Sequence, residues 1–168
     1  MKEVKEIERR FLMKKLPSFP VQWDKIYGIS QYYLHDGDLV KRVRQKIDLT
    51  DWPNNVHESY EYLHKIQKGI GEYVEMHEDI DQLKFEELSN KAFKGLYKQR
   101  YVHFANGFHF EFDEIEGVKL ILMEVELDDI NQEIIFPQEI KDLIIMEVTG
   151  IKELSNFALA TKLEHVNQ

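Results

Sequence analysis

The sequence predicts an α+β protein that is mainly β, with antiparallel strands closed into a barrel and helices packed outside it. Three observations support this fold class: runs with a period of two dominate the chain, turn-forming residues separate them, and their charged faces recur. An open sheet would expose these faces to water, whereas a closed barrel can turn them inward and leave the apolar faces to helices. Because an ordinary barrel interior is apolar, a charged one indicates a binding site in the lumen.

The first strand is expected at residues 6–11, where side chains alternate between two faces. Glu6, Glu8 and Arg10 then share one face, and apolar residues occupy the other. Carboxylates on both sides of a cation suit a surface that binds metal ions together with an anion. The alternative is a solvated face with charges of both signs, because exposed antiparallel faces are commonly charged. The recurrence of the pattern along the chain favours the first interpretation.

Later runs repeat this alternation, first with basic and then with acidic faces. The basic faces occur at residues 41–47 and 97–101, and the acidic faces at residues 108–113 and 121–127. A further lysine would come from a strand at residues 62–68. The charged residues on the four faces are Arg42, Arg44, Lys46, Lys98, Arg100, His109, Glu111, Asp113, Glu124 and Glu126. Turn-forming residues between the runs predict tight connections.

Helical patterns are sparser than strand patterns. Helices are expected at residues 17–26, 79–94, 137–143 and 151–163. The helix at 79–94 would begin at Asp79 or Asp81, whose side chains can accept hydrogen bonds from the first free backbone N–H groups. The helix at 137–143 would be entered through Pro137, which suits a first turn. The last would bury an apolar stripe that includes Leu154.

Length, charge and composition narrow the function classes. A chain of 168 residues fits a single domain spanning residues 1–168. Its net charge of −9 argues against binding a nucleic-acid duplex through the phosphates, although not against a small polyanion in an enclosed site. The absence of cysteine excludes disulfides, thiolate nucleophiles and cysteine-ligated zinc. No apolar stretch could span a bilayer and no secretory leader opens the chain, so we expect a cytoplasmic protein without a membrane partner.

The inward charges divide into a basic and an acidic set. Arginine suits phosphate because its planar fork bonds two oxygens at once, while lysine supplies a mobile point charge. Carboxylates alone would repel phosphate, but Mg²⁺ prefers a few carboxylates together with phosphate oxygens of a substrate. The two sets therefore predict a polyphosphate bridged to the protein by Mg²⁺ or Mn²⁺. The chemistry would use charge stabilisation and positioning rather than a protein nucleophile.

Short segments of the chain match, in order, the motifs of a known family. They are E-x-E-x-K at residues 6–10, I-x-Q-x-Y-L at 29–34, V-R-V-R at 40–44, K-x-R-Y at 98–101, E-x-D at 110–113, E-V-E-L at 123–127, E-V-T-G at 147–150 and S-N-x-A-L-A at 155–160. Each match is weak by itself, but the ordered set covers nearly the whole chain. In these motifs the chain resembles the CYTH-domain proteins of the triphosphate tunnel metalloenzyme superfamily. The resemblance implies a closed eight-stranded antiparallel barrel that forms a triphosphate tunnel.

The resemblance also implies roles for individual residues. One or two divalent metal ions, Mg²⁺ or Mn²⁺, would be bound by Glu6, Glu8, Glu111, Asp113, Glu124 and Glu126. Phosphate oxygens would be gripped by Arg10, Arg42, Arg44, Lys98 and Arg100. Tyr33 lies where the family has a tyrosine associated with a catalytic lysine. The expected partner is a small triphosphate substrate, and a homodimer is left open.

Two departures from the family pattern affect the site. Arg10 stands where the motif has lysine, which keeps the charge but changes its reach and geometry. The catalytic lysine of the family corresponds to Lys65 or Lys68, and only one can face the tunnel because their strand parity differs. Gly69 follows Lys68 as in the family, which favours Lys68 as catalytic and leaves Lys65 as a substrate-binding candidate. The acidic residues at 72–78 lie near the expected place without the usual E-x-E spacing.

The leading hypothesis is a metal-dependent triphosphatase that hydrolyses inorganic triphosphate or a related small triphosphate, such as a nucleoside or thiamine triphosphate. The first alternative is a class IV adenylate cyclase that makes cyclic AMP from ATP, because both enzymes would bind the triphosphate through the same residues. Similarity to the simple hydrolytic members at 123–127, 147–150 and 155–160 favours hydrolysis, by analogy within a fold. The second alternative is a non-catalytic module that binds a triphosphate-containing nucleotide or polyphosphate.

Overall fold

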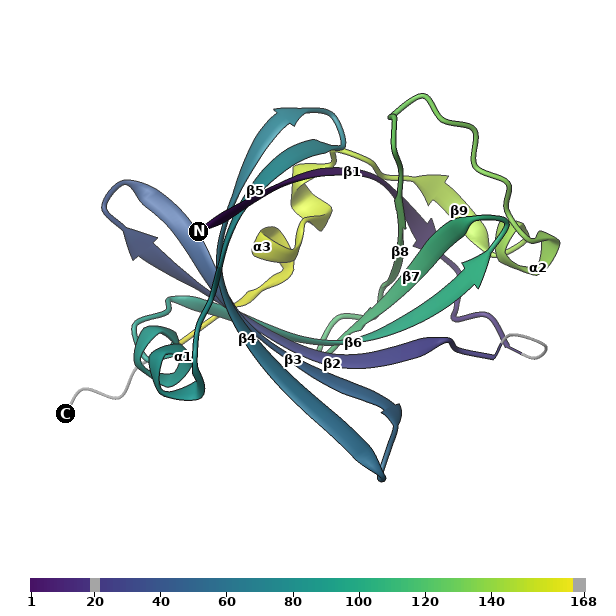
Figure 1. Ribbon diagram of the computed structural model, residues 1–168. Coiled ribbons are helices and arrows are strands. Elements are labelled where there is room, and N and C mark those ends of the chain that lie inside the picture. Colours follow the sequence, from purple (N-terminus) through teal and green to yellow (C-terminus); the bar gives the residue numbers. More distant parts are fainter. Residues whose placement is uncertain (19–21, 165–168) are drawn as a thin grey trace.

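The computed structural model describes residues 1–18 and 22–164, and eight antiparallel strands of this part close into a barrel (Figure 1). The barrel strands are β1 (Lys2–Met13), β2 (Lys25–Asp36), β3 (Leu39–Asp51), β4 (Asn55–Gly69), β5 (Glu72–Asp79), β6 (Lys94–Ala105), β7 (Phe108–Ile115) and β8 (Ile121–Glu126). Around the barrel they follow the order β6-β2-β3-β4-β5-β1-β8-β7, and pairing between β6 and β7 closes the ring. The predicted fold class is confirmed.

The β6–β7 hairpin shows how a local signal fixes the register of charged residues. Asn106 and Gly107 have φ angles of 53° and 79°, the left-handed values that an Asn-Gly hairpin turn favours. The turn sets Arg100 of β6 directly opposite Asp113 of β7. The basic face of one strand therefore lies beside the acidic face of the next.

The helices are shorter than the sequence predicts. They are α1 (Gln82–Ser89), α2 (Gln138–Lys141), the 3₁₀ helix η1 (Lys152–Leu154) and α3 (Asn156–Leu159). Of the two candidate start residues for α1, Asp81 is the cap, because its carboxylate accepts a hydrogen bond from the backbone N–H of Lys84 at 2.8 Å. Helix α2 confirms the predicted short helix after Pro137. None of these helices is long and apolar enough to cross a membrane.

Two helix predictions were wrong. Residues 151–163 form no continuous helix, because Ser155 adopts an extended conformation between η1 and α3 and its hydroxyl caps α3. The chain then continues as β10 (Thr161–Lys162), which pairs with β6. Residues 17–26 contain no helix in their described part: β2 already begins at Lys25, and residues 19–21 lie outside the described residues. A further short strand, β9 (Ile144–Glu147), pairs with β1.

The outer apolar faces of the strands are covered by chain segments outside the barrel. Phe110 and Phe112 of β7 are fully buried. They belong to a cluster that includes Ile134 and Ile140 from the segment after β8, with Trp23 packed against it. The strands can therefore turn their charged faces into the barrel, as the alternating pattern predicts.

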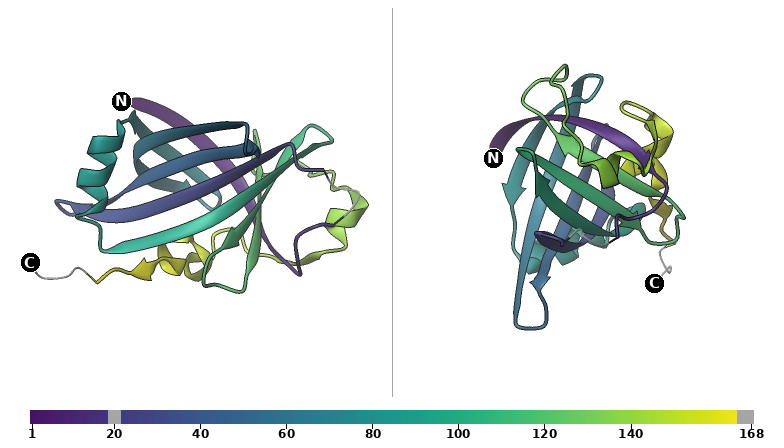
Figure 2. Two further views of the ribbon diagram at one scale, coloured as in Figure 1. Left: turned by 90° about the horizontal axis from the view of Figure 1, so that it is seen from below. Right: turned by 90° about the vertical axis from the view of Figure 1, so that its right-hand side faces the viewer.

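The C-terminal segment covers one end of the barrel. Tyr33, Leu96 and Leu122 form a buried apolar cluster against which Leu154 and Leu159 of this segment pack. In Figure 1, α3 lies inside the outline of the ring of strands. The left view of Figure 2 shows the same segment along one side of the molecule. The charged interior is thus bounded at this end by apolar side chains.

Candidate functional site

The charged faces of the strands meet inside the barrel, where side chains distant in sequence form two clusters. Several of these charged side chains are almost completely buried, with residue exposures of 1% for Lys98 and Asp113 and 5% for Glu8. Charged groups are rarely buried to this extent unless they are paired. The first cluster contains Glu6, Glu8, Lys65, Glu75 and Glu124, and the second contains Lys98, Arg100, Glu111 and Asp113.

Lys65 is at the centre of the first cluster. Its Nζ lies 2.8 Å from Glu6 Oε1 and 3.3 Å from Glu8 Oε1. Burial and the nearby Glu124 carboxylate raise the pKa of Glu8 well above its usual value. Burial and a hydrogen bond shared with Glu6 raise the pKa of Glu75 to about 7. Carboxylates are therefore in excess over cations here, and a proton shared between carboxyl groups relieves part of their repulsion.

Asp113 organises the second cluster. Its carboxylate accepts hydrogen bonds from Lys98 Nζ at 2.8 Å and from Arg100 Nε and Nη2 at 2.7 and 2.8 Å. Arg100 also contacts Glu111 at 2.5 Å and Glu124 at 3.2 Å. Burial and the charge of Arg100 lower the pKa of Lys98 to about 8, and burial raises the pKa of Glu111 to about 8 despite Arg100. Asp113 thus holds two cations in fixed positions.

Three other arginines have guanidinium N–H groups without a hydrogen-bond partner in the described part of the chain. The Nε atoms of Arg10, Arg42 and Arg44 are buried and have no hydrogen-bond partner within the described part of the chain. Arg10 Nε lies 3.3 Å from Glu124 Oε1 without hydrogen-bond geometry, and the other two arginines contact carboxylates only through Nη2. Since most buried polar groups are satisfied, such N–H groups are expected to meet a ligand or water. An anion with several oxygens would satisfy them best.

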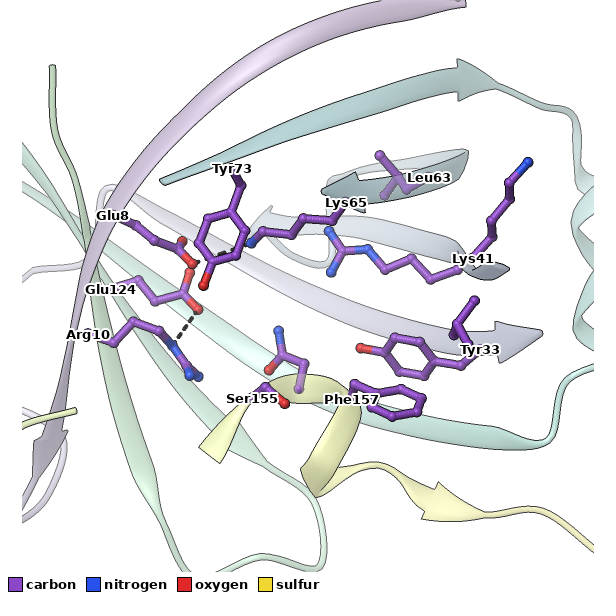
Figure 3. Close-up of a pocket in the computed structure, with 13 residues that line it drawn as sticks. Glu8, Arg10, Tyr33, Lys41, Leu63, Lys65, Tyr73, Glu124, Ser155 and Phe157 are labelled. Atoms are coloured by element: carbon purple, nitrogen blue, oxygen red, sulfur yellow. Dashed lines mark hydrogen bonds and ion pairs between the residues drawn. The ribbon is translucent and has the colours of Figure 1, made fainter. Parts of the chain in front are cut away.

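A cavity of about 290 Å³ is lined by part of the first cluster and by two of these arginines, Arg10 and Arg42 (Figure 3). Glu8, Arg10, Lys65 and Glu124 line one end of it, and Tyr33 and Phe157 lie at the other end. Its size is close to the lower limit of typical small-molecule sites, which is about 300 Å³. The cavity therefore suits one small ligand.

The structure separates the two candidate lysines. Lys65 lines the cavity and Lys68 is exposed, which corrects the expectation that Lys68 faces the tunnel. Side chains alternate along β4, so Lys65 shares its inward face with Leu63, and the pairing of β4 with β5 becomes irregular between Gln67 and Gly69. The glycine that favoured Lys68 in the sequence marks this irregular end of the strand.

The remaining predicted site residues are distributed as follows. The Tyr33 hydroxyl lines the cavity side of β2 and accepts a hydrogen bond from Gln31 Nε2 at 3.1 Å. Glu126 is exposed at the end of β8 and lies in a separate surface pocket together with Glu6. The other predicted residues belong to the two clusters or to the arginines with free Nε atoms.

Sequence reasoning gave no role to some polar residues of the interior. His77 lies 3.5 Å from Glu61 and 3.6 Å from Glu75, and these carboxylates in turn contact Arg44 and Arg42. Strand alternation could have placed these residues in the interior. Residues 73, 75 and 77 share a face of β5, just as 61, 63 and 65 share a face of β4.

The donor set of the first cluster fits a hard divalent cation. Glu6, Glu8, Glu75 and Glu124 offer carboxylate oxygens, which Mg²⁺ and Mn²⁺ prefer. Burial and then repulsion from Glu124 raise the pKa of Glu8, and a bound cation would relieve the repulsion. As the side chains stand, no three carboxylate or imidazole groups of residues 1–18 and 22–164 are grouped to hold a metal ion. The Lys65 amine takes the place between Glu6 and Glu8.

Comparison with solved structures places this barrel among known folds. The hypothetical protein NE1496 is 28% identical, with a TM-score of 0.58 over 92% of this chain and 97% of that one. The PH1819 protein from Pyrococcus horikoshii OT3 is 19% identical, with a TM-score of 0.55 over 82% of each chain. A protein from Bacillus halodurans, named as a putative adenylate cyclase, is 12% identical, with a TM-score of 0.53 over 100% of this chain and 97% of that one.

The protein has the CYTH, or triphosphate tunnel, fold. No protein-family model matches the chain, and no curated protein matches it either. The CYTH fold is thus recognised from the barrel and from the order of the motifs around it. A fold does not by itself determine an activity, so the chemistry has to be argued from the side chains inside the barrel.

Proposed function

We propose that this CYTH-fold protein is a metal-dependent triphosphatase that hydrolyses inorganic triphosphate or a related small triphosphate. The observation that carries the proposal is the set of unpartnered Nε atoms on Arg10, Arg42 and Arg44 beside an excess of buried carboxylates. Free guanidinium N–H groups can donate hydrogen bonds to phosphate oxygens, and the excess carboxylates can bind cations. A triphosphate bound with Mg²⁺ or Mn²⁺ supplies both.

In this proposal the protein acts by positioning and by charge. Arg10, Arg42 and Arg44 bind phosphate oxygens through their free N–H groups, and Asp113 keeps Lys98 and Arg100 fixed nearby. Glu6, Glu8, Glu75 and Glu124 would hold the metal ion. That ion would supply Lewis-acid polarisation of a phosphoryl oxygen. The catalytic role that the sequence analysis gave to Lys68 is proposed instead for Lys65, the lysine of β4 that lines the cavity.

The Tyr33 hydroxyl is placed to donate a hydrogen bond to the ligand. It accepts a hydrogen bond from Gln31 Nε2 at 3.1 Å, and this partner is a donor. A hydroxyl that accepts from its neighbours keeps its own proton for another acceptor. A phosphate oxygen in the cavity would be that acceptor.

The deciding experiment measures phosphate release and product identity with tripolyphosphate and with ATP, each in Mg²⁺, Mn²⁺ or EDTA. The proposal expects metal-dependent conversion of tripolyphosphate or ATP to shorter phosphates and orthophosphate. Glu8→Ala should abolish turnover in a protein that still melts cooperatively. Full activity of folded Glu8→Ala would rule out the metal assignment.

An adenylate cyclase is the second candidate, since one of the structures with this fold is named as such. The phosphate grip would be the same, but the ribose 3′-hydroxyl would attack the α-phosphorus and pyrophosphate would leave. Cyclic AMP together with pyrophosphate from ATP would establish this reaction. Ligand-induced stabilisation without turnover of any triphosphate would instead support a binding module.

A further inference from the structure

His77 of β5 lies between two carboxylates, and the proposed chemistry gives it no role. Its Nδ1 lies 3.5 Å from Glu61 Oε2, and its Nε2 lies 3.6 Å from Glu75 Oε2. The imidazole is largely enclosed, with its side chain 22% exposed. His77 is directly opposite Leu63 in the pairing of β4 with β5, so it shares the face that Leu63 and Lys65 turn toward the cavity (Figure 3).

The same two carboxylate oxygens also hold two of the arginines that we propose to bind phosphate. Glu61 Oε2 accepts a hydrogen bond from Arg44 Nη2 at 2.9 Å, and Glu75 Oε2 accepts one from Arg42 Nη2 at 3.5 Å. A carboxylate oxygen offers few lone-pair positions, so donors that approach the same oxygen compete for it. His77 therefore competes with one arginine at each of the two carboxylates.

A neutral imidazole can donate to only one of these carboxylates at a time. It carries a single N–H, so His77 donates either to Glu61 through Nδ1 or to Glu75 through Nε2. The ring thus gives the network two discrete arrangements, which is what coupling between two sites requires. Glu75 is one of the carboxylates that fit a divalent cation, so a cation bound there would favour one arrangement over the other.

We propose that His77 is a positioning residue that couples cation binding at Glu75 to the release of Arg44 for phosphate. Glu75 offers less negative charge to its other partners once it ligates a cation. His77 then donates to Glu61 through Nδ1, its proton having left Nε2 by exchange with water. Arg44 must share its acceptor, and its guanidinium, whose Nε has no partner within the described residues, is free to donate to a phosphate oxygen. The inference rests on the proposed function, which brings a cation and a phosphate into the barrel together.

The test measures how much a cation strengthens phosphate binding, by calorimetry with inorganic phosphate in saturating Mn²⁺ and in EDTA. We expect the dissociation constant in EDTA to exceed that in Mn²⁺ by a ratio on the order of 20 in the wild type. His77→Leu should lower this ratio about fivefold, because the cation then acts on phosphate only directly and through Arg42. His64→Leu is the matched control and should leave the ratio unchanged, because His64 lies on the opposite face of β4 from Leu63.

A second variant, Glu61→Gln, tests the other end of the network. It removes the carboxylate that holds Arg44, so phosphate binding in EDTA should tighten about fivefold and Mn²⁺ should strengthen it less than in the wild type. Glu58→Gln removes the same charge from an exposed position of β4, and it should shift both dissociation constants alike. His77→Leu combined with Glu61→Gln should lower the ratio no further than the stronger single variant, because the two residues act in one network.

An unchanged ratio in His77→Leu with a wild-type Tm would overturn the inference, and Glu61→Gln decides in the same way if His77→Leu lowers Tm. The absence of phosphate binding in Mn²⁺ would also overturn it. Failure of the proposed function gives a different pattern. A protein that hydrolyses no triphosphate but shows the lowered ratio in both variants keeps the coupling through His77 and loses the hydrolase. A protein that hydrolyses tripolyphosphate with one ratio in all variants keeps the hydrolase and loses the role of His77.

Discussion

Lys65 and Lys68 differ by three positions in the chain and by the side of the barrel wall on which they lie. The amine of Lys65 contacts Glu6 and Glu8, and Lys68 is exposed to solvent. Burial opposes the charge of Lys65, yet these carboxylates raise its pKa above the usual range, so the amine stays protonated in the cavity. In the proposed triphosphatase, this fixed cation would stabilise the negative charge that develops during hydrolysis.

We therefore expect Lys65→Ala to lower kcat for tripolyphosphate about 10²-fold, in line with the removal of one electrostatic stabiliser, and Lys68→Ala to leave kcat within about twofold. The two substitutions remove the same chemical group from the same strand, which makes them a matched pair. Steady-state kinetics with saturating metal would measure both. Similar losses in the two variants would mean that the inward position of Lys65 has no bearing on catalysis.

Gln31 does not line the cavity, and in the proposed mechanism it would act by positioning Tyr33. It is fully buried, donates to the Tyr33 hydroxyl at 3.1 Å, and leaves its own Oε1 without a partner in the described chain. Gln31→Leu should lower kcat about tenfold in the wild type but have almost no further effect in Tyr33→Phe, because neighbours that act as a unit are not additive. Additive losses in this double-mutant cycle would show that Gln31 supports packing alone.

At the level of elements, strand alternation predicted which charged side chains face the barrel interior, because parity is a property of the backbone. It brought Glu6, Glu8 and Arg10 to the interior without any knowledge of the fold around them. The irregular pairing near Gly69 and the partners of Glu75 could not be predicted in the same way. Both depend on contacts between strands that are distant in sequence, and a single chain pattern carries no information about them.

The start of α1 depends on which residue caps it, and the sequence left two candidates, Asp79 and Asp81. Asp81 caps α1 through its 2.8 Å bond to Lys84, and Asp79 is exposed at the end of β5. We expect Asp81→Ala to lower the free energy of unfolding by about 1 kcal/mol, the usual cost of losing an N-cap. Asp79→Ala should change it by less than about 0.5 kcal/mol, as surface substitutions usually do. Urea denaturation would compare the two, and equal losses would mean that the Asp81 bond adds no stability.

At the scale of the whole molecule, the barrel interior raises the pKa of a carboxyl group in each of the two clusters. The pKa of Glu75 is raised to about 7 and that of Glu111 to about 8, in each case mainly through burial. A carboxyl group with a raised pKa binds more protons when folded than when unfolded. Its contribution to stability is therefore present at low pH and is lost as the pH rises through the folded pKa.

The metal-free protein should accordingly become less stable between pH 5 and pH 8, with a fall in Tm of about 5 °C. Glu6 and Glu124, whose pKa values are lowered despite burial, act in the opposite sense but only below their ordinary value of 4.5, outside this window. Lys98 also opposes the trend, but its lowered pKa of about 8 places its effect above that pH. Thermal melting in EDTA would measure the slope.

The raised pKa of Glu75 should also couple metal binding to pH. In the proposed metal site a divalent cation would take the place of the proton that Glu6 and Glu75 share, so added Mg²⁺ should stabilise the protein more at pH 8 than at pH 5. Glu75→Gln removes one titrating group, and it should flatten the metal-free slope and weaken the Mg²⁺ effect together. If Glu75→Gln left the slope unchanged while abolishing the Mg²⁺ effect, Glu75 would be a ligand that does not titrate in this range, and the proton shared in the first cluster would lie elsewhere.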